Sequence, residues 1–419
     1  MLTSRFSKAA ASLAKGTINT IPLNPSNNSR NPAVPFVKIP PLLLALVAIN
    51  LSGHIAMSGG RVCTSLYALH SGASEFLVGL MIGLYGLLPM ALSLTVGRWV
   101  DRIGPFVPMR LGMFAVTLGI AAPAILPSIN TLFITASLCG LGFMVVALSA
   151  QHAVGCLCHD AENRVAYFGW LALGHSASGI LGPVIVGFAI DLFGFTAGFA
   201  LLAVSAAISL LLVILNKAGL RSLHPEPLSN ERHNVWTLVE QPTMRRIYIV
   251  GILVAISWDL FTFLMPILGH REHLSASAIG AILASFAVGT FSIRLVMARL
   301  ATRFTEWQML RAAIVIIVIV YLTLPIVQSR PLFFMLAFML GASVGCSQPN
   351  MLSLLHAAAP PGRSAEAIGL RGMLANASMV AVPLLFGATA ASVGLLPMFW
   401  TVAALVATAL PVANRAVRD

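Results

Sequence analysis

The sequence predicts an all-α membrane protein in which twelve transmembrane helices form two pseudo-symmetric six-helix bundles. Three observations predict this fold class. First, 58% of the residues are hydrophobic and only 9% are charged, whereas roughly 25% of the residues in a soluble domain are charged. Second, apolar stretches of about 20 residues, the length that spans the hydrocarbon core of a bilayer, recur along the whole chain. Third, the spacing of glycine, proline and polar residues in the second half repeats that of the first half.

The apolar stretches are expected to be helices rather than barrel strands. Every backbone polar group in hydrocarbon needs a partner within the protein, and the sequence lacks the alternating pattern of a barrel. The spans of the first bundle are expected near 41–68, 74–97, 109–127, 130–154, 166–190 and 196–216. Those of the second bundle are expected near 247–268, 275–298, 308–328, 331–357, 365–391 and 395–413.

The internal repeat relates the two bundles at an almost constant offset. With an offset of 200, Gly169, Ser178, Pro183 and Gly187 recur as Gly369, Ser378, Pro383 and Gly387. With an offset of 201, Gly79, Arg98 and Arg102 recur as Gly280, Arg299 and Arg303. Tandem copies of one multi-helix unit are an architecture of transporters, in which the substrate site lies between the copies near the membrane midplane. The repeat therefore indicates transport, and residues that break it are candidates for function.

The distribution of positive charge predicts the orientation, because short cytoplasmic loops of membrane proteins are rich in Lys and Arg. Most of the 25 Lys and Arg residues fall on one side of the membrane if the N-terminus is cytoplasmic. The loops of the other side hold only Arg271 and Arg330. Both termini are therefore expected in the cytoplasm, with the chain in a bacterial inner membrane. The net charge of +12 then reflects topology and does not indicate nucleic-acid binding.

These patterns divide the chain into five parts. Residues 1–40 are basic and contain no acidic residue, which predicts a disordered cytoplasmic tail attracted to anionic lipid; an organelle transit peptide has a similar composition. Residues 41–217 and 245–413 form the two bundles. The segment 218–244 is expected to be a cytoplasmic linker, and 414–419 a short cytoplasmic tail.

A loop motif lies between the second and third predicted spans, where residues 97–109 read GRWVDRIGPFVPM. This segment resembles the loop signature of the major facilitator superfamily, in which a glycine is followed by an Asp-Arg pair and a second glycine. The matching residues are Gly97, Asp101, Arg102 and Gly104, whereas Pro105 and Phe106 replace two basic residues. The resemblance implies the twelve-helix fold of that superfamily and a turn that controls conformational change, with its carboxylate near helix N-termini.

The fifth predicted span carries a second resemblance to the same superfamily. Its spacing is similar to a signature of the antiporters, with two of the glycines replaced: Gly169, Ser178, Gly182, Pro183, Val186 and Gly187. Small residues let helix backbones approach closely, and proline bends a helix. The match is closest to the twelve-helix drug:proton antiporters and implies export. The arginine that this branch carries in the fourth span is absent from residues 136–142.

Two residues within the spans are candidates for proton coupling. Asp259 is the only carboxylate placed deep inside a predicted span, where an ionised side chain costs about 2.5–3.5 kcal/mol on insertion scales. Burial disfavours its charged form and a nearby arginine favours it, so its protonation is a candidate switch. A fixed Asp–Arg pair that holds helices together is the alternative. His175 is the second candidate, because histidine titrates near neutral pH, and a packed neutral histidine is the alternative.

Polar residues at helical spacings predict a central cavity. Asn50, His54, Met57 and Arg61 share one face of the first span. Arg294 breaks the repeat, because Ser93 stands at the equivalent position. The substrate-site candidates are Asn50, His54, Arg61, Trp258, Arg294, Gln348, Asn350 and Arg371. For Arg61 and Arg371 the alternative is a side chain that extends to the membrane interface.

The sequence thus predicts a secondary transporter and not an enzyme. We expect proton-coupled export of a small organic molecule of amphiphilic or drug-like character, with protons and the lipid bilayer as further partners and a monomer as the unit. Proton-coupled uptake of a small anionic solute and a non-transporting membrane sensor are the alternatives. No cofactor is expected, and the 5 cysteines lack the spacing of a metal site.

Overall fold

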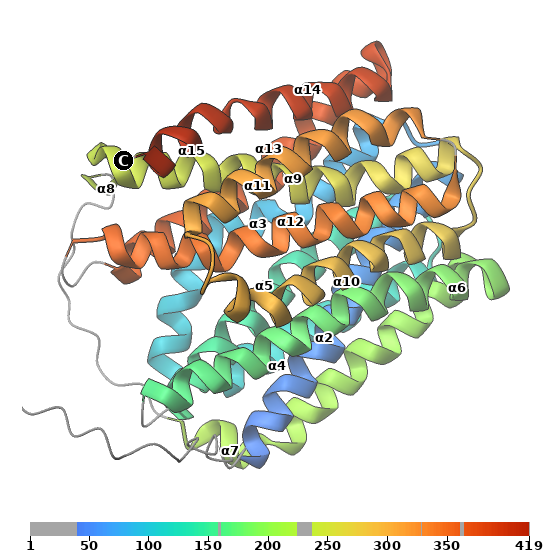
Figure 1. Cartoon of the computed structure of the whole chain (residues 1–419). Coiled ribbons are helices and arrows are strands. Elements are labelled where there is room, and N and C mark those ends of the chain that lie inside the picture. The colour runs from blue at the N-terminus through green and yellow to red at the C-terminus, as the bar shows by residue number, and fades with distance from the viewer. Residues whose placement is uncertain (1–39, 158–160, 224–236, 328, 361–363, 419) are drawn as a thin grey trace, which may run out of the picture. The chain divides into compact units, whose positions relative to one another are not determined.

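Long helices form almost all of the described chain, and no strand is found in it. The computed structural model describes residues 40–157, 161–223, 237–327, 329–360 and 364–418. The predicted tail 1–40 lies outside these ranges apart from Pro40, and so does much of the predicted linker 218–244. The helices lie side by side (Figure 1). The predicted all-α class is therefore confirmed.

The first half of the protein consists of five long helices that account for six membrane spans. They are α2 (Pro41–His70), α3 (Glu75–Ile103), α4 (Phe106–Ile125), α5 (Ile129–Leu157) and α6 (Ala161–Leu215). The apolar part of α6 has 49 residues, which is about 74 Å of helix and long enough to cross a bilayer core twice. The chain turns within it at Gly194, where φ is 81° and ψ is 176°. A short helix, α7 (Lys217–Arg221), follows.

The second half supplies the other six spans. Its helices are α8 (Thr237–Glu240), α9 (Pro242–Arg271), α10 (Ala276–Leu300), α11 (Glu306–Thr323) with the 3-10 turn η1 (Leu324–Ile326), α12 (Arg330–Ala358), α13 (Ser364–Val393), α14 (Leu395–Ala407) and α15 (Ala409–Arg418). The last two helices together form one span. Within the described residues 11 helical segments are long and apolar enough to cross a membrane, and α6 crosses twice. The twelve predicted spans are therefore present.

The internal repeat is visible in the backbone as well as in the sequence. Ser74 caps α3 by accepting a hydrogen bond from the backbone N–H of Leu77, and Ser275, 201 positions later, caps α10 in the same way. Gly194 and Gly394 both have φ near +80°, a conformation that glycine adopts without steric cost. The structure thus extends the repeat to turns that the sequence comparison did not include.

The two halves meet along two helix pairs that the repeat relates to each other: α3 packs on α13, and α10 packs on α6 (Figure 1). In the first pair a Cβ atom on Gly79 would lie 2.3 Å from the carbonyl oxygen of Pro383. In the second pair a Cβ atom on Gly280 would lie 2.2 Å from the carbonyl oxygen of Pro183. Glycine is therefore required at both contacts, since only its missing side chain lets the backbones come this close.

Polar contacts join the halves at the same end of the bundle. Arg271 forms an ion pair with Glu75. The carboxylate of Asp191 in α6 accepts hydrogen bonds from the backbone N–H groups of Ala276 (2.9 Å) and Ser277 (2.8 Å), at the start of α10. We call this the sealed end. The other end, where α3 ends and α4 begins, is called the basic end because Arg98, Arg102 and Arg110 lie there.

Asp191→Ala is expected to weaken the sealed end. The substitution removes both acceptors from the N-terminus of α10, and the loss of a helix cap costs about 1 kcal/mol, to which the lost interaction with the helix dipole adds about 0.3–1 kcal/mol. The fraction of molecules open at this end should rise about tenfold. Distances between spin labels on the exposed residues Ser71 and Glu272 measure it. Asp191→Asn keeps one acceptor oxygen, so its open fraction should lie between those of the parent protein and Asp191→Ala. Identical distances in all three proteins would contradict a role of Asp191 in holding this end together.

Candidate functional site

A cavity of about 900 Å³ lies between the two halves, within the size range of small-molecule sites. Helices of both halves line it, and its polar residues include most of the predicted ones: Asn50, His54, Arg61, His175, Trp258, Asp259, Arg294, Gln348 and Arg371. Aromatic and Met side chains, among them Phe143, Phe286, Met351 and Met379, cover the rest. The face shared by Asn50, His54, Met57 and Arg61 in α2 therefore points into the cavity, as its spacing predicted.

Asp259 is the only carboxylate among the described residues that line this cavity. Its side chain is 8% exposed, and the hydroxyl of Ser378 in α13 donates a hydrogen bond to Oδ2 at 2.9 Å. The Ser378 hydroxyl also lies 2.8 Å from the carbonyl oxygen of Ala375. Because a hydroxyl has one hydrogen, protonated Asp259 could donate to Ser378 while Ser378 donates to Ala375. The site can therefore hold a hydrogen bond in either protonation state of Asp259.

Arg61 is the cation whose electric field acts on Asp259, but the two side chains are not in direct contact. Among the described residues Asp259 forms no ion pair. One terminal nitrogen of Arg61, Nη2, is buried and has no hydrogen-bond partner in the described part of the chain. A buried guanidinium nitrogen without a partner is costly, and Arg61 lines the cavity, so its positive charge acts on an anionic group that enters there. Among the described residues, therefore, no arginine forms the fixed ion pair with Asp259 that the sequence offered as an alternative.

Arg294 connects the two halves across the cavity. Its Nη1 donates to the hydroxyl of Ser176 in α6 at 2.9 Å, and its Nη2 donates to Oε1 of Gln348 in α12 at 2.9 Å. Both partners are neutral, so no described carboxylate contacts this charge. Nearby, the ring of Trp258 packs edge-on against Phe286 with centroids 4.8 Å apart. Arg294 therefore supplies an uncompensated positive charge beside an aromatic wall.

Two histidines pack against each other on the first-half side of the cavity, with their rings tilted by 33°. The ring centroids of His54 and His175 are 3.8 Å apart, and Nδ1 of His54 lies 2.7 Å from the hydroxyl oxygen of Ser178. That hydroxyl also lies 2.7 Å from the carbonyl oxygen of His175. When it donates its hydrogen to this carbonyl, Nδ1 of His54 is the donor to Ser178 and Nε2 is the acceptor of a neutral ring; in the other tautomer the hydroxyl donates to Nδ1. A proton arriving at this pair would bind to a ring nitrogen that Ser178 does not occupy.

Ser178 and Ser378 occupy equivalent positions of the repeat and make equivalent hydrogen bonds in the two halves. Each hydrogen-bonds a titratable side chain of the neighbouring helix, His54 in the first half and Asp259 in the second. Ser178 replaces a glycine of the antiporter signature, and its contact with His54 gives a physical reason for that replacement. The repeat therefore preserves the hydrogen-bonding serine while the titratable partner differs.

The cavity carries more positive than negative charge. Arg61, Arg294 and Arg371 face the single carboxylate of Asp259. Nε of Arg371 is also buried and has no hydrogen-bond partner within the described ranges. Even with both histidines neutral, the side chains that line the cavity sum to a positive charge. Such a site favours a ligand with a carboxylate or another anionic group, which can bind an arginine with charge-assisted hydrogen bonds.

Asn350 is a correction to the predicted cavity. It does not line the cavity; its side-chain amide donates to the carbonyl oxygen of Cys346 at 2.9 Å, within α12. Gln348 and Pro349 line the cavity instead. Consecutive positions differ by about 100° around a helix, so Gln348 and Asn350, which flank Pro349, cannot both point the same way.

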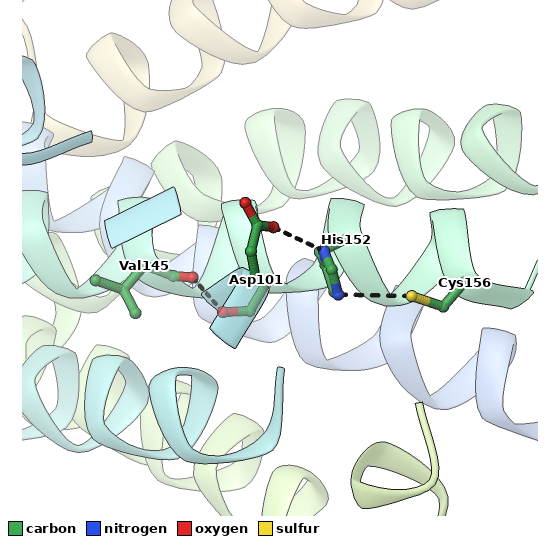
Figure 2. A network of polar contacts seen from close by, with 5 residues as sticks. Asp101, Val145, His152 and Cys156 are labelled. Atoms are coloured by element: carbon green, nitrogen blue, oxygen red, sulfur yellow. Dashed lines mark hydrogen bonds and ion pairs between the residues drawn. The ribbon is translucent and has the colours of Figure 1, made fainter. Parts of the chain in front are cut away.

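The residues of the loop motif lie at the basic end, where Gly97, Asp101 and Arg102 belong to the last turns of α3. Gly104 ends this helix with φ at 77°. Asp101 was expected near helix N-termini, but its carboxylate contacts His152 in α5, with Oδ1 3.3 Å from Nδ1; Figure 2 shows this pair. Nothing in the sequence indicates this partner, because His152 lies 51 positions away in another helix.

Phe106 takes the place of a basic residue in that motif, and the structure gives a reason. The ring is 3% exposed, and the guanidinium groups of Arg110 and Arg221 lie 5.5 Å and 5.1 Å from its centroid. These are cation–π distances. The aromatic ring thus holds two arginines at the basic end, where α4 meets α7.

The glycines and proline of the fifth-span motif make close helix contacts. A Cβ atom on Gly182 would lie 2.1 Å from the hydroxyl oxygen of Ser58 and 3.0 Å from the backbone nitrogen of Gly59, so Gly182 sets the approach of α6 to α2. A Cβ atom on Gly187 would lie 2.6 Å from the carbonyl oxygen of Ala276 in α10. Pro183 and Gly187 therefore belong to the contact between the halves.

Comparisons with known proteins agree with this architecture. A family model described as Major Facilitator Superfamily matches residues 42–243 and 247–417. No protein of curated function matches the sequence significantly. Among solved structures, a POT family transporter in complex with a thioalcohol-conjugated peptide is similar over 91% of this chain and 96% of its own, with 16% identity and a TM-score of 0.76.

Two further solved structures have the same fold. A POT family transporter in complex with 5-aminolevulinic acid matches with 16% identity and a TM-score of 0.75, over 91% of this chain and 96% of its own. A bacterial homolog of the human lysosomal transporter Spinster, in an inward-facing and occupied conformation, matches with 14% identity and a TM-score of 0.75, over 90% of this chain and 96% of its own. Identities this low show a shared fold only. The ligand of this chain has to be inferred from the residues of its own cavity.

Proposed function

This chain belongs to the major facilitator superfamily, and we propose that it is a proton-coupled symporter of a small organic anion. Membership makes it a multi-pass membrane transporter and not an enzyme. The observation that carries the proposal is the cavity in which Arg61, Arg294 and Arg371 face one carboxylate, Asp259. The bound ligands of the similar POT structures, a peptide conjugate and 5-aminolevulinic acid, are small polar molecules of those proteins.

The proposed coupling follows from charge. Ionised Asp259 lowers the positive potential that Arg61 creates in the cavity and repels an anion. Protonation removes that negative charge while Ser378 keeps its hydrogen bond, so the cavity becomes more positive by one unit. An anion then binds better to the protonated cavity, and by linkage the proton binds better to the loaded cavity. Proton and anion would therefore cross together.

Alternating access supplies the movement in this proposal. The contacts of the sealed end close one side of the cavity, and the halves would rock about it to open that end and close the basic end. Arg294 hydrogen-bonds residues of both halves, so a ligand that binds Arg294 would change the contact between the halves. His54 and His175 give the first half a second place for a proton.

Export of an amphiphilic or drug-like molecule by proton antiport is the second candidate. The fifth-span motif favours it, and so does the aromatic and Met lining of the cavity. Antiport requires that proton and substrate compete, which a cationic substrate would do at Asp259. Membership of the drug:proton antiporter branch stays a prediction.

The experiment that separates these candidates uses purified protein in liposomes with an imposed pH gradient. The proposal expects organic anions to accumulate on the alkaline side, with protons moving in the same direction. Movement of organic cations or neutral amphiphiles against the proton flow would overturn the proposal and support antiport. Ligand binding without flux of any compound would overturn both and support a membrane sensor.

Arg61→Gln is expected to lower the affinity for the anion about tenfold to a hundredfold. The substitution removes a charge-assisted hydrogen bond to the anion, which contributes about 1.5–3 kcal/mol. Binding to the detergent-purified protein measures the change without any transport step. Arg311→Gln is the matched control, because Arg311 is exposed on α11 and outside the cavity. Equal affinity in both variants would contradict the assignment of Arg61 to the anion site.

A further inference from the structure

A second cluster of titratable side chains lies at the basic end, outside the central cavity. Oδ1 of Asp101 lies 3.3 Å from Nδ1 of His152, and Nε2 of His152 lies 3.5 Å from Sγ of Cys156. Figure 2 shows the three side chains in a row, with the histidine between the carboxylate and the thiol. The proposed transport cycle gives no task to His152 or Cys156.

The order of the three groups fixes their protons. A carboxylate only accepts hydrogen bonds, so the contact between Oδ1 of Asp101 and Nδ1 favours the tautomer of a neutral His152 that carries its hydrogen on Nδ1. Nε2 then has a free electron pair and accepts a hydrogen bond from the thiol of Cys156. A base in contact with a thiol, itself oriented by a carboxylate, is the arrangement that activates a nucleophilic cysteine.

The fold holds the three groups together, and Cys156 is not fully buried. His152 and Cys156 are four residues apart in α5, which places them on one face of the helix, and the last turn of α3, which packs on α5, brings Asp101 to them. Cys156 is partly exposed, and the side chains of His152 and Asp101 are 17% and 39% exposed. The cysteines Cys63, Cys139 and Cys346 are buried.

We propose that Cys156 is an activated thiol and a site of covalent modification by small electrophiles, in particular of oxidation by hydroperoxides. His152 is the base that takes the thiol proton, and Asp101 is a positioning residue that orients His152. The proposal is independent of the transport function, because it concerns the reactivity of one sulfur atom.

The chemical step balances with a hydroperoxide as the named oxidant. The proton of Sγ moves to Nε2 of His152, and the thiolate attacks the terminal oxygen of the peroxide. An S–O bond forms while the O–O bond breaks, and the leaving oxygen takes the proton from His152 to become an alcohol, or water in the case of hydrogen peroxide. Sulfur is oxidised by two electrons to a sulfenic acid and the peroxide is reduced.

The test compares reaction rates in the full chain with Cys156 as the only cysteine, made by replacing Cys63, Cys139, Cys158 and Cys346 with alanine. The probes are iodoacetamide and hydrogen peroxide, and mass spectrometry follows the adduct. An ordinary thiol is only a few per cent ionised at neutral pH, so His152→Ala should slow both reactions about tenfold. Asp101→Asn should slow them less. Added imidazole should restore part of the rate in His152→Ala, which a merely structural role of His152 would not allow.

Two controls separate reactivity from folding and access. After long exposure to iodoacetamide every variant should reach the same extent of labelling at Cys156. A cysteine placed at the exposed residue Ser128, in a chain without Cys156, should react at the same rate with and without His152→Ala. An unchanged rate at Cys156 in His152→Ala, a slowed rate that imidazole does not restore, or no labelling of Cys156 in the folded protein would each overturn the proposal.

Discussion

Asp259→Asn is expected to reduce substrate accumulation driven by a pH gradient to the level of protein-free liposomes, while exchange of substrate across the membrane continues. Asparagine resembles the protonated aspartate in shape and charge, and its side-chain oxygen can still accept the hydrogen bond from Ser378. In the proposed cycle accumulation requires Asp259 to gain and lose a proton, whereas exchange requires only the loaded form. The two activities should therefore separate in one variant.

Both activities of Asp259→Asn can be measured in the same proteoliposome preparation. Accumulation is followed with an imposed pH gradient, and exchange is followed by counterflow of labelled substrate without one. Asp259→Glu is the matched control, because it keeps a titratable carboxyl group and should retain part of the accumulation. Gradient-driven accumulation by Asp259→Asn at the parent level would show that the coupling proton binds elsewhere, with His54 and His175 as the next candidates.

The two halves of the cavity differ in chemistry although their scaffold is repeated. Ser178 and Ser378 are equivalent, yet the first bonds a histidine and the second bonds an aspartate. At the offset of 201 residues, Asp259 corresponds to Ser58 in the first half, and Arg294 corresponds to Ser93. A strictly symmetric cavity would carry the same charge on both sides. These two breaks in the repeat therefore give the second half the carboxylate of Asp259 and the cation of Arg294, in addition to Arg371.

Much of the fold could be predicted from the sequence because the signals for it are local. Apolar length predicts each span, and the repeat relates residues of the two halves such as Gly79 and Gly280, or Pro183 and Pro383. The cavity face of α2 was also predictable, since Asn50, His54 and Arg61 follow the period of one helix. Such patterns need no knowledge of which helix packs against which.

The contacts between distant helices could not be predicted in the same way. Glu75 and Arg271 are 196 positions apart, and no pattern in either segment indicates that the two residues pair. Asp101 and His152 pair for a similar reason, because the packing of α3 on α5 decides their approach. Asn350 shows the limit of spacing arguments, since a proline between two polar residues does not decide which of them faces a cavity. Helix rotation and helix neighbours are properties of the packed structure.

The structure also changes which of the two transport functions, export by antiport or symport of an anion, is better supported. The sequence favoured export, because the fifth-span motif resembles that of antiporters. That motif proved to be a set of helix contacts, in which Gly182 meets α2 and Gly187 meets α10, so its residues bear on movement of the halves and not on substrate charge. Arg61, Arg294 and Arg371 line the cavity together with one described carboxylate, Asp259, and this excess of positive charge favours an anion.

Gly280→Ala is expected to keep the sealed end open and to abolish transport. The new methyl group would lie 2.2 Å from the carbonyl oxygen of Pro183, far inside an ordinary carbon–oxygen contact. The obstacle is backbone and cannot rotate away, so α10 and α6 would have to separate by about 1 Å or more. Separation also breaks the hydrogen bonds from Asp191 to the start of α10. The conformation closed at this end becomes inaccessible, and alternating access stops.

The measurement combines transport with spin-label distances between Ser71 and Glu272 at the sealed end. Gly79→Ala should have the same effect, because Gly79 is the repeat equivalent of Gly280. A Cβ atom added to Gly79 would lie 2.3 Å from the carbonyl oxygen of Pro383. Gly372→Ala in α13 is the matched control, since a Cβ there meets no atom within 4 Å. If Gly280→Ala and Gly372→Ala both kept the parent distances and rate, closure of the α6–α10 contact would not be part of the transport cycle. Loss of transport in Gly280→Ala with an unchanged distance would place its cause elsewhere than in the sealed end.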